Sequence, residues 1–146
     1  MESHSETITS TAERAAHLIG VYLDPTATRL KITQGEAHVL AHLARHGPTA
    51  IAALHREFGH KRSTLTNIID RLEGRKLVRR QLNPGDRRSF VVSLTAAGER
   101  MATQVTAALD ELERSLASLV DARDLAGIAA VTRALQTLVS RTDSSP

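Results

Sequence analysis

The hydrophobic periodicity of this chain changes after Leu77, and that change limits the folds available to it. Up to this point apolar residues recur every three or four positions, as they do on one face of a helix. Beyond it, residues 78–82 and 89–94 have the pattern of short strands, separated by a turn with Pro84 and Gly85 at its centre. Pro followed by Gly suits a type II turn. The sequence therefore predicts a run of helices interrupted by one β-hairpin.

Capping residues and helix breakers set the ends of the predicted helices. Thr33 and Glu36 have the spacing of a capping box, Thr49 suits the N-cap of the next helix, and Gly59 suits a left-handed residue after it. The first helix is expected to stop before Pro25. The predicted helices cover residues 10–24, 33–46, 49–58, 62–75, 95–119 and 121–138.

The order of these elements predicts the fold class. Two short helices joined by a tight turn form a helix-turn-helix, and the hairpin that follows makes the unit a winged helix-turn-helix in a mainly α chain. The last two helices carry stripes of Leu, Val and Ile that a winged unit of this size cannot cover alone, so we expect a homodimer. The predicted domains are residues 1–32, part of the dimerisation region, 33–96, the winged lobe, and 97–146, the C-terminal dimerisation helices.

Basic residues are concentrated in the second half of the winged unit. The whole chain has a formal net charge of +3, but the segment between His60 and Phe90 carries +6 and the remainder −3. Such a concentration suits binding to a phosphate backbone. Because the chain has two Phe, one Tyr and no Trp, stacking on single-stranded bases is not favoured, and we expect duplex DNA as the partner. The basic residues are Lys61, Arg62, Arg71, Arg75, Lys76, Arg79, Arg80, Arg87 and Arg88, against Asp70, Glu73 and Asp86.

The predicted recognition helix, residues 62–75, has a polar face. Its Leu and Ile residues share one side, and Ser63, Thr66 and Asn67 fall on the other. Asn pairs with adenine and Arg with guanine in a major groove, while Ser and Thr reach bases or phosphates. Taken singly, Ser63 also suits a helix N-cap, and Arg71 suits a phosphate as well as a base. The DNA-binding candidates of this helix are Arg62, Ser63, Thr64, Thr66, Asn67 and Arg71.

The tip of the hairpin is also basic. Arg87 and Arg88, next to the constrained turn, would form a narrow cationic finger that fits a minor groove, where the negative potential is enhanced in A·T-rich DNA. Asp86 is placed to hold one of them in position. An isolated Asp-Arg-Arg sequence is more often a solvated turn, but this one follows a helix-turn-helix. Arg87 and Arg88 are therefore DNA-binding candidates, with Asp86 as wing support.

Three segments follow one another in a specific order: ITQGEAHVLAHLARHGPTAIAAL, STLTNIIDRLEGRKLVRR and NPGDRRSFVVSLTAAG. The Asp-x-Arg of the hairpin followed by Leu-Thr-x-x-Gly is their most distinctive part. In these features residues 33–98 resemble the winged helix of the MarR family of bacterial regulators. The resemblance implies a dimer in which the first helix and the last two helices of both subunits intertwine. It also implies a wing contact through Arg88, oriented by Asp86.

The same resemblance implies a repressor that occupies an operator and is released by a small ligand bound between the dimerisation and DNA-binding lobes. Twofold symmetry would present two recognition helices to successive major grooves, so the operator is expected to be pseudo-palindromic, with half-sites about one helical turn apart.

One residue departs from the family pattern. Relatives place Gly immediately before the Leu-Val that follows the recognition helix, whereas this chain has Lys76 there and Gly74 two residues earlier. A positive φ at Lys76 would cost on the order of 1 kcal/mol. The alternative is a helix that ends differently and changes the tilt of the wing.

Three histidines suggest a different function. His38, His42 and His46 recur every four residues on the second helix, a spacing that suits two ligands of a zinc or nickel ion. The third drifts about 40° around the helix, and no Cys is present to complete the ligand shell. A polar stripe without metal is the simpler interpretation, so we expect no metal and no cofactor, with a metal-sensing repressor as the alternative.

Several functional classes are not supported by the sequence. It shows no apolar run of membrane-spanning length and no export signal, so we expect a cytoplasmic protein that does not enter a membrane. It has no phosphate-binding glycine loop, nucleophile elbow or His-Glu-x-x-His motif, so we expect no enzymatic activity. The expected function is that of a ligand-relieved, DNA-binding transcriptional regulator. The alternative function is that of a winged-helix module that binds another protein. The salt dependence of binding to duplex DNA distinguishes the two functions.

Overall fold

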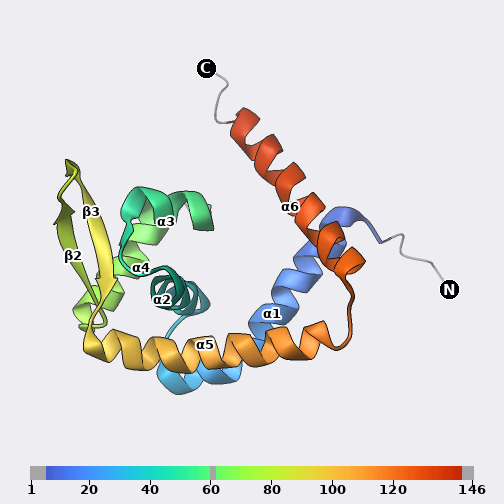
Figure 1. Ribbon diagram of the computed structural model, residues 1–146, viewed down its shortest axis with the longest axis horizontal. Coiled ribbons are helices and arrows are strands. Elements are labelled where there is room, and N and C mark those ends of the chain that lie inside the picture. Colours follow the sequence, from blue (N-terminus) through green and yellow to red (C-terminus); the bar gives the residue numbers. More distant parts are fainter. Residues whose placement is uncertain (1–5, 60–61, 143–146) are drawn as a thin grey trace. The chain divides into compact units, whose positions relative to one another are not determined.

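The computed structural model describes residues 6–59 and 62–142 and confirms a mainly helical chain with one small sheet (Figure 1). The helices are α1 (Ile8–Leu30), α2 (Gln34–His46), α3 (Ile51–Phe58), α4 (Arg62–Gly74), α5 (Ala96–Ala117) and α6 (Ala122–Thr142). The strands are β1 (Thr49–Ala50), β2 (Val78–Asn83) and β3 (Asp86–Leu94). No helix in the described ranges is long and apolar enough to cross a membrane.

The chain divides into two compact units. The larger, Gly20–Asp110, holds the winged helix-turn-helix together with the second part of α1 and most of α5. The smaller consists of residues 1–19 and 111–146, and its helices are the start of α1, the end of α5 and α6.

The core of the larger unit is built from the apolar faces of α2, α3 and α4 with the base of the sheet and α5. Its best-covered side chains are fully buried leucine, isoleucine and valine residues. Helical periodicity predicts most of these positions, because i, i+3 and i+4 residues lie side by side on a helix, but it does not mark Val39, and Val92 belongs to β3. They are Val39, Leu40, Leu54, Leu65, Ile69, Leu72, Val92 and Val105.

The sheet has three antiparallel strands in the order β1-β3-β2. The predicted hairpin is confirmed, with Val78 opposite Leu94 at its base and Leu82 opposite Phe90 near its tip. Figure 1 shows β2 and β3 extending together from the body of the larger unit. The type II turn is wrong: Gly85 lacks the positive φ that such a turn requires, and its N–H donates instead to the Asn83 side chain, 3.0 Å away.

Most predicted helix caps are confirmed. Thr33 accepts from the N–H of Glu36, whose carboxylate accepts in return from the N–H of Thr33. Asp121 accepts from the N–H groups of the first turn of α6 in the same way. The cap assigned to Thr49 is wrong, because Thr49 lies in β1 and its hydroxyl donates to the carbonyl of Gly47. Strand β1 is too short for its pattern to be recognised in the sequence.

Helix α1 does not stop before Pro25, as the sequence suggested, but continues to Leu30. Proline removes one hydrogen bond, to the carbonyl four residues earlier, and crowds that turn. Leu23 and Ala27, on either side of Pro25, are both buried in the larger unit. Their packing favours the helical path over the break.

Candidate nucleic-acid interface

The polar face predicted on the recognition helix is exposed on α4. The side chains of Ser63, Thr64, Thr66 and Asn67 all face solvent, while Leu65, Ile68, Ile69 and Leu72 are buried beneath them. The side chain of Arg62 lies outside the described residues. Burial of the opposite face fixes the rotation of α4 about its axis, so the exposed side chains are held in one orientation rather than swinging with the helix.

Arg71, the other arginine predicted to bind DNA from this helix, has an internal partner. Its Nε lies 2.9 Å from Oε1 of Glu36, whose side chain is only 6% exposed. The other oxygen of Glu36 accepts from the backbone N–H of Thr33. A buried carboxylate needs such partners, because desolvation without them is costly. Arg71 therefore ties the recognition helix to the start of α2, although 57% of its own side chain stays exposed.

Arg80 joins the wing to the recognition helix. From β2 its guanidinium lies 2.7 Å from Asp70 and 2.9 Å from Glu73, both on α4. The backbone N–H of Arg80 also donates to Glu73. These hydrogen bonds lower the pKa of Glu73 and raise that of Arg80, so both groups stay charged. The angle between the hairpin and α4 is thus set by side chains of both elements.

Arg75 lies between α4 and the hairpin and binds the end of α1. Its guanidinium donates to the main-chain carbonyls of Lys31, at 2.7 Å, and Leu30, at 3.2 Å. These are among the carbonyls that the end of a helix leaves without an intrahelical donor. Arg75 therefore stabilises the C-terminal end of α1 and links it to the recognition helix.

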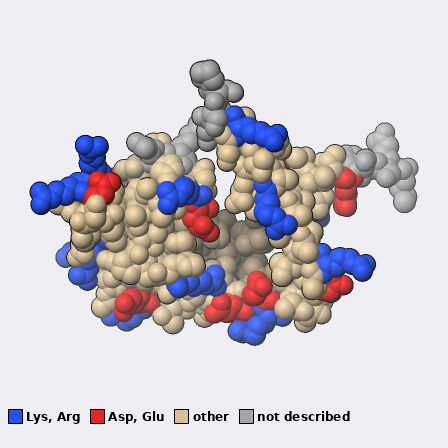
Figure 2. All heavy atoms as spheres, turned by 45° about the horizontal axis from the view of Figure 1, so that its top comes forward, with Lys and Arg blue, Asp and Glu red and all other residues tan. Residues whose placement is uncertain are grey.

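Three of the basic side chains in the segment 60–90 are thus occupied by protein groups. Four others, Lys76, Arg79, Arg87 and Arg88, are exposed, and within the described part of the chain none of them has an ion-pair partner. Figure 2 shows Lys and Arg side chains projecting at the hairpin with acidic side chains close by. Among the side chains that the structure describes in this segment, the positive charge without an ion-pair partner therefore lies on the hairpin and its base.

The wing turn is ordered by short side chains. Asp86 accepts from the backbone N–H of Arg88 at 2.9 Å, and Asn83 donates to the hydroxyl of Ser89 at 3.2 Å. Asp86 thus holds the main chain at Arg88 and does not form an ion pair with its guanidinium. This hydrogen bond fixes the backbone position from which the Arg88 side chain projects. Among the described residues, no carboxylate neutralises the Arg88 guanidinium.

The junction between α4 and the wing contains the residue that departs from the family pattern. Lys76 has a φ of 58°, the left-handed conformation that favours glycine. Its N–H donates to Glu73 and the next N–H, of Leu77, donates to Leu72, which is the hydrogen-bond pattern of a Schellman motif. The helix therefore ends in a motif that usually has glycine at this position, and Lys76 bears the strain.

The Leu-Thr-x-x-Gly motif holds this junction against α5. Thr95 donates from its hydroxyl to the carbonyl of Lys76 and from its N–H to the carbonyl of Leu77. The same hydroxyl accepts from the N–H of Gly98. A Cβ on Gly98 would lie 1.8 Å from the oxygen of Leu77, so only glycine allows this approach.

The histidine stripe forms a ring contact. The rings of His42 and His46 lie 4.4 Å apart, and His42 meets the edge of Phe58 at 5.5 Å. Burial lowers the pKa of His42, His46 lowers it further, and Glu57 opposes them. Among the described residues, no group of three or more His, Cys, Asp or Glu side chains is placed to hold a metal ion.

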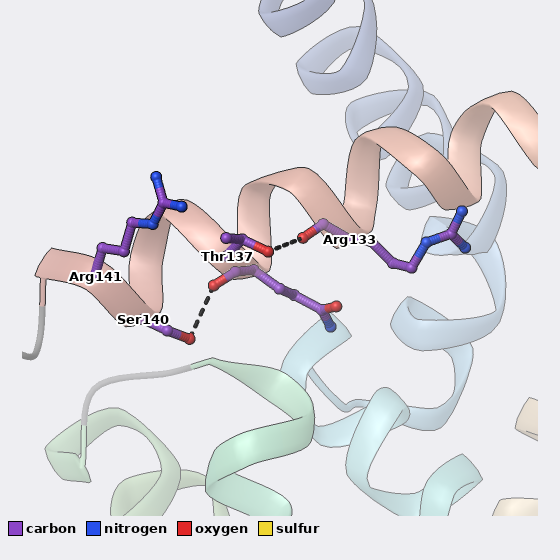
Figure 3. A pocket seen from close by; sticks show the side chains of 5 residues that line it. Arg133, Thr137, Ser140 and Arg141 are labelled. Carbon is purple, nitrogen blue, oxygen red and sulfur yellow. Dashed lines mark hydrogen bonds between the residues drawn. The ribbon is translucent and has the colours of Figure 1, made fainter.

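Hollows in the surface of the described chain are candidate ligand sites, and two of them differ in their lining residues. One, of about 440 Å³, lies in the larger unit and is lined by the end of α2, the end of β3 and the start of α5. The other is lined by α6 alone, and Figure 3 shows its side chains along that helix. There the hydroxyls of Thr137 and Ser140 donate to the carbonyls of Arg133 and Gln136. A surface lined by one helix does not enclose a ligand, so the first hollow is the better ligand candidate.

Comparison with known proteins agrees with this architecture. The model of the MarR family matches residues 32–90. The transcriptional regulator PecS of Dickeya dadantii is 34% identical over 114 residues, which cover 76% of this chain and 69% of PecS. The chain belongs to the MarR family. Two other curated relatives, both named transcriptional repressors, are 35% identical but align over only 44% of their own length.

Solved structures show the fold of this MarR-family chain. MepR of S. aureus in its DNA-binding conformation superposes with a TM-score of 0.82 at 23% identity, covering 91% of this chain and 99% of MepR. NadR in complex with 4-hydroxyphenylacetate superposes with a TM-score of 0.78 at 22% identity, covering 93% of this chain and 96% of NadR. The winged helix-turn-helix fold predicted from the sequence is confirmed.

Sequence reasoning found the polar face of α4 and the basic wing but missed the internal roles of three arginines. The sequence predicts Arg71 as a DNA contact and shows Arg75 and Arg80 only as part of the basic segment. Glu36 and Lys31 lie 35 and 44 residues away along the chain, so no local pattern shows these contacts. Arg80 carried the one available signal: Asp70 and Glu73 precede it at a spacing that places both carboxylates near the same side of α4.

Proposed function

We propose that this MarR-family chain is a dimeric transcriptional regulator that binds duplex DNA through α4 and the β2–β3 wing and does not transform a substrate. The observation that carries the proposal is the pairing of an exposed polar helix face with a hairpin on which three exposed arginines, Arg79, Arg87 and Arg88, have no ion-pair partner among the described residues. The helix suits a major groove and the narrow hairpin the adjacent minor groove.

Arg88 and Arg87 are the proposed wing contacts, and Ser63, Thr64, Thr66 and Asn67 the proposed helix contacts. Asp86 supports the wing by fixing the backbone at Arg88. Arg71 remains a candidate for a phosphate, because more than half of its side chain is exposed despite its bond to Glu36. Arg62 is proposed from the sequence alone.

A second copy of the chain is the proposed cover for α6. This helix has no buried residue, and Leu125, Ile128, Leu135 and Leu138 are between 45% and 65% exposed. An exposed apolar stripe of this length usually marks a surface that another molecule covers. Light scattering should therefore give twice the mass of the chain, and Leu135→Asp should shift the protein towards the monomer.

We also propose repression that a small molecule relieves, in the cytoplasm where the DNA lies. Its support is the family, the relatives named as repressors and NadR, whose structure holds 4-hydroxyphenylacetate. The hollow beside α2 and α5 has a volume within the range of small-molecule sites. The probes are 4-hydroxyphenylacetate and other phenolic acids, added to the protein–DNA complex.

The deciding experiment is a DNA titration at several salt concentrations. A duplex selected by the protein from a random library should bind far more tightly than an unrelated duplex, and affinity should fall by orders of magnitude between about 50 and 200 mM salt. Arg88→Ala should weaken binding more than tenfold and reduce the salt slope by about one. The matched control is Arg100→Ala, an exposed arginine of α5 outside the basic segment.

Base reading is tested separately at Asn67. Asn67→Ala should reduce the preference for the selected duplex over the unrelated one, whereas an equal loss on both would make Asn67 a backbone contact. A protein that binds no duplex but captures an acidic protein would support the interaction-module alternative. Tight binding that needs added zinc or nickel would support the metal sensor at His38, His42 and His46.

A further inference from the structure

The inner face of the wing carries an exposed apolar pair whose role is not explained by the fold. Leu82 is 59% exposed and Phe90 42% exposed, and they lie directly opposite each other on β2 and β3. A cross-strand pair of this kind adds a little to the stability of a hairpin, but a polar pair of β-forming residues would do so without exposing apolar surface. Phe90 is also one of only two phenylalanines in the chain.

Strand alternation shows which way this pair faces. Val78, Arg80 and Leu82 share one face of β2, since successive side chains point to opposite sides. On this face Val78 is buried and Arg80 bonds to Asp70 and Glu73 of α4. Leu82 lies two residues beyond Arg80 on the same face, closer to the tip of the hairpin. The apolar pair therefore lies on the side of the wing that looks towards the recognition helix, beyond the ion pairs that join the two.

The charged residues near Leu82 and Phe90 indicate which kind of molecule the pair contacts. Exposed Arg88 lies two positions before Phe90 on β3 and therefore shares its face, whereas Arg80 on the same face is neutralised by two carboxylates. An apolar pair beside an arginine without an ion-pair partner among the described residues fits a polyanion that has apolar facets. The sugar–phosphate backbone has this chemistry, because the C–H faces of deoxyribose alternate with phosphates. A helix in a major groove and a wing in the adjacent minor groove also have one backbone strand between them.

We propose that Leu82 and Phe90 pack against the deoxyribose faces of the DNA strand that passes between α4 and the wing. The inference rests on the proposed function and adds a sequence-independent, salt-independent contact to it. Phosphate contacts release counterions and so set the salt slope, whereas an apolar contact does not change that slope. The pair would strengthen binding to any duplex and would not read bases.

Fluorine NMR tests the contact without altering the surface. Labelling with 4-fluorophenylalanine gives two signals, Phe58 and Phe90, which the Phe90→Thr variant assigns. The probes are the selected duplex and an unrelated duplex, each of about 30 base pairs. Both should shift the Phe90 signal. Phe58, which is partly buried against the core and in ring contact with His42, is the internal reference and should not move.

Affinity measurements provide the second test. The double variant Leu82→Thr, Phe90→Thr keeps β-forming residues in the strands and should bind both duplexes roughly tenfold more weakly with an unchanged salt slope. Gln81→Thr, at the same level on the opposite face, is the matched control and should bind as the unaltered protein does. Thermal melting of each variant checks the fold.

The outcomes separate this inference from the function on which it rests. If the unaltered protein binds no duplex, the proposed function fails. If it binds duplex DNA while the Phe90 signal stays in place, or while the double variant keeps full affinity, only the contact with deoxyribose is overturned. A Phe90 signal that moves with protein concentration and not with DNA would assign the pair to contact with another copy of the chain, and would overturn the inference as well.

Discussion

The carboxylate of Glu36 lies 2.9 Å from Nε of Arg71 and joins the first turn of α2 to the recognition helix. The same Glu36 completes the capping box with Thr33, so one buried side chain serves two elements. Loss of Arg71 would leave the carboxylate buried with a backbone N–H as its remaining partner. An arginine that sequence reasoning assigned to DNA therefore also stabilises the fold.

Arg71→Ala should lower the free energy of unfolding by about 2 kcal/mol, because it leaves a buried charge without its ionic partner. Urea denaturation measures this loss. Adding Glu36→Gln should recover part of it, since the neutral amide needs no counter-charge. Equal losses in Arg71→Ala and in the double variant would show that the cost does not come from an unpaired charge on Glu36.

The parts of the fold found from the sequence are those with local causes. The capping box at Thr33 and the helix start at Thr95 depend on residues within one turn, and their spacing reveals them. The continuation of α1 through Pro25 depends on tertiary burial of its neighbours, which overrides a local preference. The bonds of Arg75 to the end of α1 likewise join residues far apart in sequence, so periodicity and capping rules do not predict them.

Lys76→Gly should raise the free energy of unfolding by about 1 kcal/mol, since glycine adopts the φ of 58° at this position without strain. Urea denaturation is again the measurement. Lys31, with a φ of 56° at the end of α1, offers an independent test, and Lys31→Gly should give a similar gain. A loss of stability in both variants would mean that the lysine side chains contribute more than the strain removes.

Gly98→Ala should destabilise the protein by about 3 kcal/mol, because the new Cβ would lie 1.8 Å from the Leu77 carbonyl oxygen, a backbone atom that cannot rotate away as the end of a side chain can. It should also weaken DNA binding, since the start of α5 holds the junction that sets the wing. Gly74→Ala is the control: nothing lies within 4 Å of its Cβ position and its φ is not positive, so its stability should match or exceed that of the unaltered protein.

His42 should make the protein less stable in mild acid. Its pKa in the folded chain lies below the ordinary value of 6.5, chiefly because burial disfavours the charged ring, and additionally because His46 is close. The unfolded chain therefore binds a proton at His42 more readily than the folded chain does, and stability falls as the pH drops through 6.5 towards the folded pKa. The urea midpoint should accordingly be lower at about pH 5.5 than at about pH 7.5.

His42→Gln should reduce this difference, whereas His17→Gln, at an exposed position of α1, should leave it unchanged. If His42→Gln preserved the full pH dependence, the acid sensitivity would belong to other groups and the ring pair with His46 would have no part in it.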